Sequence, residues 1–223
     1  IEDHFDHSFE LEEALAAKGK DEALHLVKDM LHNPGSVFYV RQQQPAGLGH
    51  AVWCARHLVG SEPVAVLLAD DLILGASCVK EMVDAYKGGN MVAVMDVPHE
   101  QTGSYGIVTP GADDGRIVQV EGLVEKPDPS SAPSNIAVVG RYIITPEVFE
   151  TLAAQERGAG GEIQLTDALA KQIGKAPFSG VRFSGERFDC GSKLGFLQAN
   201  VAFGLNNDAM RDQLRDWLGE RLG

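Results

Sequence analysis

Long hydrophobic runs, clustered cysteines and an excess of positive charge are all missing from this sequence. No apolar stretch approaches the roughly 20 residues that a membrane-spanning helix needs. The three cysteines, Cys54, Cys78 and Cys190, are too few and too scattered for a disulfide framework or a zinc site. We therefore expect reduced thiols in a cytoplasmic protein.

Acidic side chains outnumber basic ones. The chain of 223 residues carries 32 Asp and Glu against 19 Lys and Arg, a formal net charge of −13. Nucleic acids and anionic membranes both demand a basic surface, so we expect neither as a partner. A phosphorylated small molecule is not excluded, because a few local cations, backbone N–H groups and a metal can hold it. Taken alone, the acidity indicates only solubility.

Strands and helices alternate along the middle of the chain. Residues 63–69 (PVAVLLA) are nearly all apolar and predict a strand buried on both faces, as in a parallel sheet. A helix over 76–86 and a second buried strand over 91–97 follow. This order is typical of an α/β fold.

From Pro98 onward, glycines separate shorter strands. Asp113-Asp114-Gly115 predicts a hairpin turn between 106–109 and 116–120. Without repeats or a long linker, we expect one domain over residues 1–223. Further strands are expected over 37–40, 135–144 and 181–183, and helices over 9–18, 21–31, 50–58, 164–173, 192–205 and 207–222, with one more starting at Thr145-Pro146.

The first candidate binding element combines Gln42 with the turn Gly47-Leu48-Gly49 before a predicted helix. Glycines let backbone approach a ligand closely, and free N–H groups point outward at a helix start. The Gln42 amide can pair with both a donor and an acceptor on a base edge. An ordinary tight turn and an exposed, uninvolved glutamine fit the same residues.

Asp70 follows the apolar stretch 63–69, at the carboxyl end of the predicted strand. Ligands bind outside the carboxyl ends of strands in open α/β sheets, and an aspartate there suits Mg²⁺ held against substrate phosphates. A helix N-cap is the alternative role. Asp71 would point the opposite way if the strand continues, so Asp70 is the better candidate metal ligand.

Two further segments carry charged side chains. In Glu125-Lys126-Pro127, a carboxylate that can accept sugar hydroxyls precedes a lysine that can neutralise a phosphate. An exposed ion pair before a loop fits this segment too. In Asp189-Cys190-Gly191, Asp189 is either a second metal ligand facing Asp70 or the cap of a helix near Ser192.

The ordered set of segments resembles the bacterial UTP–glucose-1-phosphate uridylyltransferases, within the sugar-phosphate nucleotidyltransferase family. Each segment is unspecific alone, but together they span essentially the whole chain. The segments are 42–52 (QQQPAGLGHAV), 67–70 (LLAD), 105–108 (YGIV), 123–127 (LVEKP), 132–142 (APSNIAVVGRY), 161–169 (GEIQLTDAL) and 188–195 (FDCGSKLG).

The resemblance implies an α/β nucleotidyltransferase (Rossmann-like) three-layer fold around a mixed, mainly parallel central sheet. It implies that UTP and glucose 1-phosphate give UDP-glucose and pyrophosphate, in a homodimer or homotetramer. Gln42 would read the uracil edge and Gly47 would lie against the base. Gly106 and Glu125 would contact glucose.

The same resemblance assigns the charged roles. Lys126 would contact the sugar phosphate, and Asp70 would bind Mg²⁺, which makes these two the expected catalytic residues. Asp189 as second metal ligand is a weaker extension from related sugar-phosphate nucleotidyltransferases.

One departure from the family is the lack of its opening strand and Gly-x-Gly-Thr-Arg loop, which cradles the triphosphate. Because losing a central strand should destroy the core, we expect these residues to precede Ile1 in the full protein. The alternatives are a nucleotidyltransferase for another base or sugar, such as one using dTTP, and a non-catalytic nucleotide-sugar-binding homologue.

Overall fold

A computed structural model describes residues 2–31, 33 and 35–223. The chain divides into two compact units, one ending at Gln43 and the other spanning Gln44–Gly223. The single nucleotidyltransferase domain expected over residues 1–223 stays a prediction.

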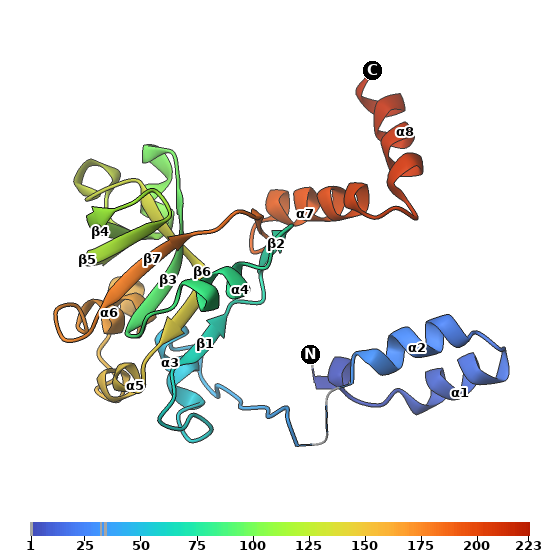
Figure 1. Cartoon of the computed structure of the whole chain (residues 1–223), viewed down its shortest axis with the longest axis horizontal. Helices are drawn as coiled ribbons and strands as arrows, with labels where there is room; N and C mark the ends of the chain where they lie inside the picture. The colour runs from blue at the N-terminus through green and yellow to red at the C-terminus, as the bar shows by residue number, and fades with distance from the viewer. Residues whose placement is uncertain (1, 32, 34) are drawn as a thin grey trace. The chain divides into compact units, whose positions relative to one another are not determined.

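The N-terminal unit is built from two short helices, α1 (Phe9–Ala17) and α2 (Asp21–Asp29), which pack against each other after a 3₁₀ turn over Glu2–Phe5 (Figure 1). Residues 37–40, expected as a strand, form none. Their β-branched and aromatic side chains favour extended backbone, but a strand also needs a neighbour for its ladder hydrogen bonds.

A six-stranded mixed sheet forms the centre of the second unit, with the order β1-β6-β3-β7-β5-β4 (Figure 1). The mixed sheet is confirmed, but among the described strands only β3 and β7 pair in parallel. The mainly parallel pairing that we expected is not seen among these strands, because the β4–β5 hairpin is antiparallel and β6 runs against both β1 and β3. The strands are β1 (Val64–Leu67), β3 (Asn90–Asp96), β4 (Gly106–Asp113), β5 (Ile117–Glu125), β6 (Ile136–Ile144) and β7 (Phe178–Arg182).

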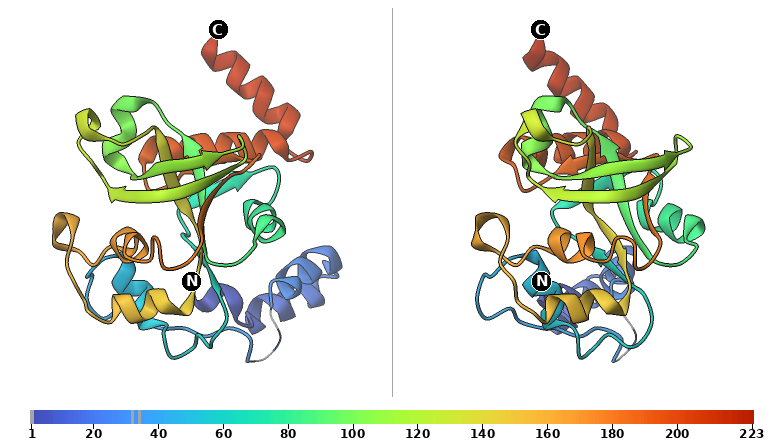
Figure 2. Two further views of the ribbon diagram at one scale, coloured as in Figure 1. Left: turned by 60° about the vertical axis from the view of Figure 1, so that its left-hand side comes forward. Right: turned by 90° about the vertical axis from the view of Figure 1, so that its left-hand side faces the viewer.

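Helices cover both faces of this sheet, which confirms the three-layer arrangement (Figure 2). Alternate residues of β3 show the division: Val92 and Val94 pack with α3, α5 and α6, whereas Met91 and Ala93 pack with α4. The helices are α3 (Leu48–Cys54), α4 (Cys78–Ala85), α5 (Pro146–Leu152) and α6 (Leu165–Ala170), with 3₁₀ turns at His99–Ser104, Pro129–Ser131 and Ala159–Gly161.

The strand expected to be buried on both faces, 63–69, is shorter and more exposed than predicted. It becomes β1, whose residues alternate between half-buried and exposed. Among the described strands only β6 pairs with β1, so one edge of β1 gains no strand cover.

A second, two-stranded sheet pairs β2 (Asp71–Leu74) with β8 (Glu186–Asp189) in antiparallel register. The sequence did not predict β2. Asp71 lies opposite Asp189 in this register, so the chain after β1 and the chain before the closing helices meet here. The closing helices are α7 (Lys193–Asn206) and α8 (Arg211–Leu222).

Two further features concern the cysteines and the lengths of the helices. Cys54, Cys78 and Cys190 are all free thiols. Of the helices in the described part of the chain, none is long and apolar enough to cross a membrane.

Candidate active site

One cleft of about 330 Å³ in the second unit brings together most of the predicted site residues. Its walls come from the β1–β2 connection, the start of β4, the end of β5, β6, α6 and β8. Asp70, Gly106, Glu125, Lys126 and Asp189 all line it. These residues lie up to about 120 positions apart in the chain, so the fold and not local sequence assembles the site.

Asp70 and Asp189 are brought together by the two-stranded sheet. The Cys190 N–H donates to the Asp70 carbonyl at 2.7 Å, just beyond the Asp71–Asp189 pair. Asp70 is exposed and Asp71 is buried, as alternation along a strand predicts. The exposed neighbour is therefore the one available to a ligand.

The side chains of these two aspartates converge beside Gly191. A Cβ placed on Gly191 would lie 3.1 Å from Asp189 Oδ1 and 3.2 Å from Asp70 Oδ2. The Gly191 N–H donates to the same Asp189 Oδ1 at 3.0 Å, which helps to orient that carboxylate. Two carboxylate oxygens thus face one small space at the edge of the cleft.

The opposite wall carries the Gly106–Glu125 pair of the β4–β5 ladder. A Cβ on Gly106 would lie 3.2 Å from Glu125 Oε2 and 3.2 Å from Thr166 Cγ2. A side chain at position 106 would therefore crowd Glu125 and Thr166, and glycine avoids that crowding in the cleft wall.

Lys126 leaves β5 with a positive φ of 46°, a conformation uncommon for residues with a side chain. Its N–H donates to the Tyr105 carbonyl at 2.9 Å, and its Nζ lies 3.8 Å from Glu125 Oε1. The lysine side chain is half exposed, so its ammonium can reach a ligand in the cleft.

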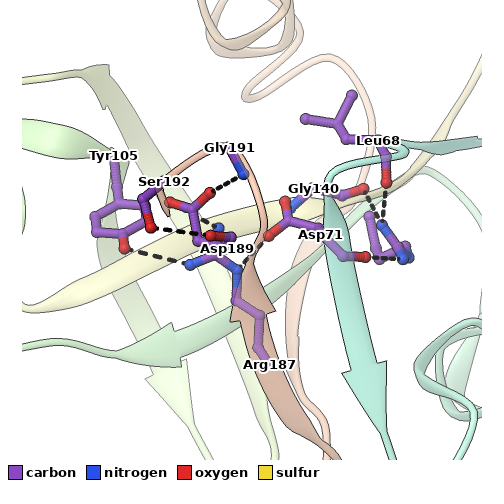
Figure 3. Close-up of polar contacts among 9 residues, drawn as sticks. Leu68, Asp71, Tyr105, Gly140, Arg187, Asp189, Gly191 and Ser192 are labelled. Atoms are coloured by element: carbon purple, nitrogen blue, oxygen red, sulfur yellow. Dashed lines mark hydrogen bonds and ion pairs between the residues drawn. The ribbon is translucent and has the colours of Figure 1, made fainter. Parts of the chain in front are cut away.

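A buried ionic network underlies the two aspartates (Figure 3). Asp71 accepts from the Arg187 Nε through one carboxylate oxygen and from the Gly140 N–H at 2.9 Å through the other. Arg187 also donates to the Tyr105 hydroxyl at 3.2 Å. The side chains of Arg187 and Asp71 are only 10% and 7% exposed, so each charge depends on the other for compensation.

Two pKa shifts report the low polarity of this region. Burial opposes the Arg187 charge, but the Asp71 carboxylate and the Tyr105 hydroxyl outweigh it and raise the pKa of Arg187. Burial, followed by repulsion from Glu125 and Asp71, raises the pKa of Tyr142 in the cleft wall. Tyr142 is therefore a neutral hydroxyl at physiological pH.

The connection that carries Asp70 is held to β6 by Arg141. Its guanidinium donates to the Leu68 carbonyl at 2.9 Å and to the Asp71 carbonyl. The Leu68 N–H in turn donates to the Gly140 carbonyl at 2.9 Å. These bonds fix the backbone on both sides of Asp70.

Gly47 lies next to the cleft, while its neighbour Leu48 lines it. Gly47 has φ = 106° and precedes α3, and a Cβ there would meet the Ile163 carbonyl at 2.7 Å. Gly49 N–H donates to that carbonyl at 2.8 Å. Gln42 belongs to the N-terminal unit and is partly buried there.

Several cleft residues were not singled out from the sequence. Tyr105 stood next to the assigned Gly106 and Arg187 two positions before the assigned Asp189, and a charged or aromatic residue so near a candidate ligand is a usable signal. The α6 side of the cleft lay inside the segment 161–169 without any assigned role. The residues missed are Tyr105, Glu162, Gln164, Thr166 and Arg187.

Known proteins resemble the chain in both sequence and structure. It is 48% identical over 219 residues to a UTP–glucose-1-phosphate uridylyltransferase of Komagataeibacter xylinus, covering 97% of this chain and 75% of that protein. A Bacillus subtilis protein of the same name is 46% identical over 217 residues, covering 96% and 74%.

Two solved structures share the fold. A UTP-bound UDP-glucose pyrophosphorylase from Acinetobacter baumannii superposes with a TM-score of 0.88 at 36% identity, covering 99% of this chain and 78% of that one. A UDP-glucose pyrophosphorylase complexed with UDP-glucose gives 0.82 at 36% identity, covering 92% and 76%.

A three-layer α/β fold whose cleft joins paired carboxylates to a lysine is suited to binding phosphorylated substrates. The nucleotidyl transferase family model matches residues 7–204. The chain belongs to that family.

Replacing Asp71 by Ala should lower the free energy of unfolding. The change leaves the Arg187 guanidinium buried without its counter-ion, which costs about 3–5 kcal/mol of unfolding free energy. Urea denaturation followed by circular dichroism measures this. Asp84→Ala, which removes an exposed ion pair with Lys80 on α4, is the control and should cost less than about 1 kcal/mol. Equal effects of the two substitutions would contradict the buried pairing.

Proposed function

We propose that this protein transfers the uridylyl group of UTP to glucose 1-phosphate, giving UDP-glucose and pyrophosphate. Relatives at 42–48% identity carry the name of this activity, and similar structures hold UTP or UDP-glucose. The observation that carries the proposal is the single cleft that contains Asp70, Asp189, Glu125 and Lys126.

The reaction needs positioning and charge stabilisation more than proton transfer. A phosphate oxygen of glucose 1-phosphate attacks the α-phosphorus of UTP, a new P–O bond forms, and the bond to pyrophosphate breaks. The second pKa of a phosphate monoester is about 6, so the attacking group is already anionic near neutral pH. No general base is required, and catalysis comes from holding two anions close together.

The proposed metal is Mg²⁺, held by Asp70 and Asp189. Nucleotidyltransferases of this family generally use a divalent metal. The two carboxylate oxygens that face the space beside Gly191 fit a small hard cation. In the described residues no group of three or more His, Cys, Asp or Glu forms a metal cage, which suits Mg²⁺ because it keeps several waters and substrate phosphates as ligands. When bound, it would neutralise triphosphate charge.

The remaining roles follow from the cleft walls. Lys126 is proposed to bind the phosphate of glucose 1-phosphate and to offset repulsion between the two substrates. Glu125 is proposed to accept hydrogen bonds from the hydroxyls of glucose, and Gly106, its partner in the β4–β5 ladder, is proposed to contact the sugar as well. For Gln42 and Gly47, the proposed contacts with the uracil rest on the sequence resemblance.

The identity of the base and of the sugar is tested by initial rates with matched substrates. Release of pyrophosphate should be fastest with UTP and glucose 1-phosphate, and kcat/KM should fall when dTTP replaces UTP or galactose 1-phosphate replaces glucose 1-phosphate. If another pair of substrates gave a higher kcat/KM, that pair would be the substrates in place of UTP and glucose 1-phosphate.

The homodimer or homotetramer implied by the resemblance stays a prediction, and sedimentation velocity measures the oligomeric state.

Replacing Lys126 by Ala should lower kcat/KM about 100-fold or more, because a charge that stabilises the transition state is removed. Steady-state kinetics with both substrates measures the loss. The control is Lys80→Ala, since Lys80 lies exposed on α4 and pairs only with Asp84 among the described interactions. Near-unchanged turnover in the Lys126 variant would remove that residue from the mechanism.

Replacing Asp70 by Asn should weaken binding of a divalent metal by about tenfold or more, because a charged oxygen ligand becomes neutral. Mn²⁺ is a convenient probe, since electron paramagnetic resonance follows its binding without turnover. The control is Asp84→Asn, an exposed carboxylate on α4 that should leave Mn²⁺ affinity unchanged. If Asp70→Asn also left it unchanged, the metal would lie elsewhere.

A further inference from the structure

Arg187 occupies a central place between the two walls of the cleft. Its Nε donates to Asp71 Oδ1, one terminal nitrogen donates to the Tyr105 hydroxyl at 3.2 Å, and the other lies 4.0 Å from Asp189 Oδ2 (Figure 3). No role was assigned to it from the sequence. Two of these partners lie outside its own strand: Asp71 begins β2 and Tyr105 directly precedes β4, whereas Asp189 ends β8, which also carries Arg187.

The guanidinium is already engaged with protein groups. Arg187 forms a buried ion pair with Asp71, and its side chain is only 10% exposed. The planar guanidinium presents its donors in a fixed fork, and two edges of that fork are taken by Asp71 and Tyr105. Its effect on a substrate must therefore pass through the residues that it holds.

On the side of the proposed metal, Arg187 helps to orient the Asp189 carboxylate, so that its two oxygens face different groups. The Oδ2 atom faces the Arg187 guanidinium at 4.0 Å, a distance too long for a hydrogen bond but short enough for charge attraction. The Oδ1 atom accepts from the Gly191 N–H and faces the space shared with Asp70. Arg187 also anchors Asp71, whose backbone continues directly from Asp70.

On the sugar side, Arg187 holds Tyr105 by its hydroxyl. Tyr105 precedes Gly106 in the chain, and its carbonyl accepts the Lys126 N–H at 2.9 Å. A shift of Tyr105 would therefore move both the glycine that faces Glu125 and the lysine proposed to bind phosphate.

We propose that Arg187 is a positioning residue: by bonding to Asp71 and Tyr105 at once, it sets the metal-binding aspartates and the sugar-phosphate-binding residues in one common geometry. This rests on the proposed function. An arginine is suited to the task because its rigid fork fixes directions that the single ammonium of a lysine does not. A conservative Arg187→Lys change should therefore keep the positive charge but lose the simultaneous bonds to Asp71 and Tyr105.

The experiment measures two readouts in Arg187→Lys, Tyr105→Phe and the double variant. The first is Mn²⁺ affinity without turnover, and the second is KM for glucose 1-phosphate together with kcat. Arg182→Lys is the control, because Arg182 is also paired with carboxylates, those of Asp96 and Asp113, and lines no part of the cleft.

Tyr105→Phe should raise KM for glucose 1-phosphate about fivefold, the effect of one ordinary hydrogen bond, and leave Mn²⁺ affinity and kcat unchanged. Arg187→Lys should raise KM by a similar factor and also weaken Mn²⁺ about tenfold, as expected when the partner that orients a metal ligand is lost. Because lysine keeps the positive charge, altered repulsion of the metal does not account for that loss.

The double variant decides whether Arg187 and Tyr105 act through one bond. Its KM should equal that of Arg187→Lys alone, since the bond is already lost. A double variant whose increase in KM is the product of the two single increases would overturn the proposal. So would an Mn²⁺ affinity of Arg187→Lys within twofold of wild type. Tyr105→Phe retains the ion pair and should fold in any case, so an unchanged KM in that variant also overturns it.

Failure of the proposed function would look different. In that case the wild-type protein would not form UDP-glucose from UTP and glucose 1-phosphate at all. If the wild type is active and Arg187→Lys behaves like Arg182→Lys in both readouts, only the positioning role is rejected.

Discussion

The arrangement of the second unit depends on the hydrogen bonds and the ion pair of the buried Asp71 carboxylate. It accepts from Gly140 in the six-stranded sheet and from Arg187 in the two-stranded sheet, so one buried anion joins both. Taking two charges out of water is costly, and only complementary hydrogen bonds offset the loss of hydration. The pair therefore gives the junction a preferred geometry more than it adds net stability. A hydrophobic pair of the same size would fill the volume without fixing directions.

From that junction the cleft follows by chain connectivity. Asp70 precedes the buried carboxylate and faces the opposite way, and Asp189 lies across the ladder from Asp71. Tyr105, the other partner of Arg187, leads directly into Gly106. The groups proposed to bind the phosphorylated substrates are thus attached to backbone that the buried ion pair and the two ladders hold. Preorganisation of this kind reduces the ordering that binding would otherwise require.

Local signals in the sequence predicted the helices and the hairpin well, because capping residues, apolar periodicity and Asp-Asp-Gly turns act over a few residues. They predicted Asp70, Glu125, Lys126 and Asp189 as candidates, the family resemblance added Gly106, and the structure gathers these five in one cleft. They did not predict β2, whose pairing partner lies more than 110 residues away. Nor did they predict Arg187, since burial turns an ordinary charged residue into a structural one only after folding. The parallel pairing expected for most strands is not seen among the described ones. Strand propensity carries no information on the pairing partner or its direction.

The charges of the cleft indicate how the proposed divalent cation would assist phosphate binding. Among the described lining residues, carboxylates outnumber cationic groups, and the Arg187 charge is already compensated by Asp71. The Lys126 ammonium lies 3.8 Å from Glu125, which offsets part of its attraction for an anion. Two anionic substrates entering such a site would meet net repulsion from the protein as well as from each other. As proposed, a divalent ion held by Asp70 and Asp189 would neutralise those two carboxylates, so metal binding and nucleotide binding should be strongly coupled. The acidity of the wall and the anionic nature of the substrates are then compatible, because each supplies ligands to the same ion.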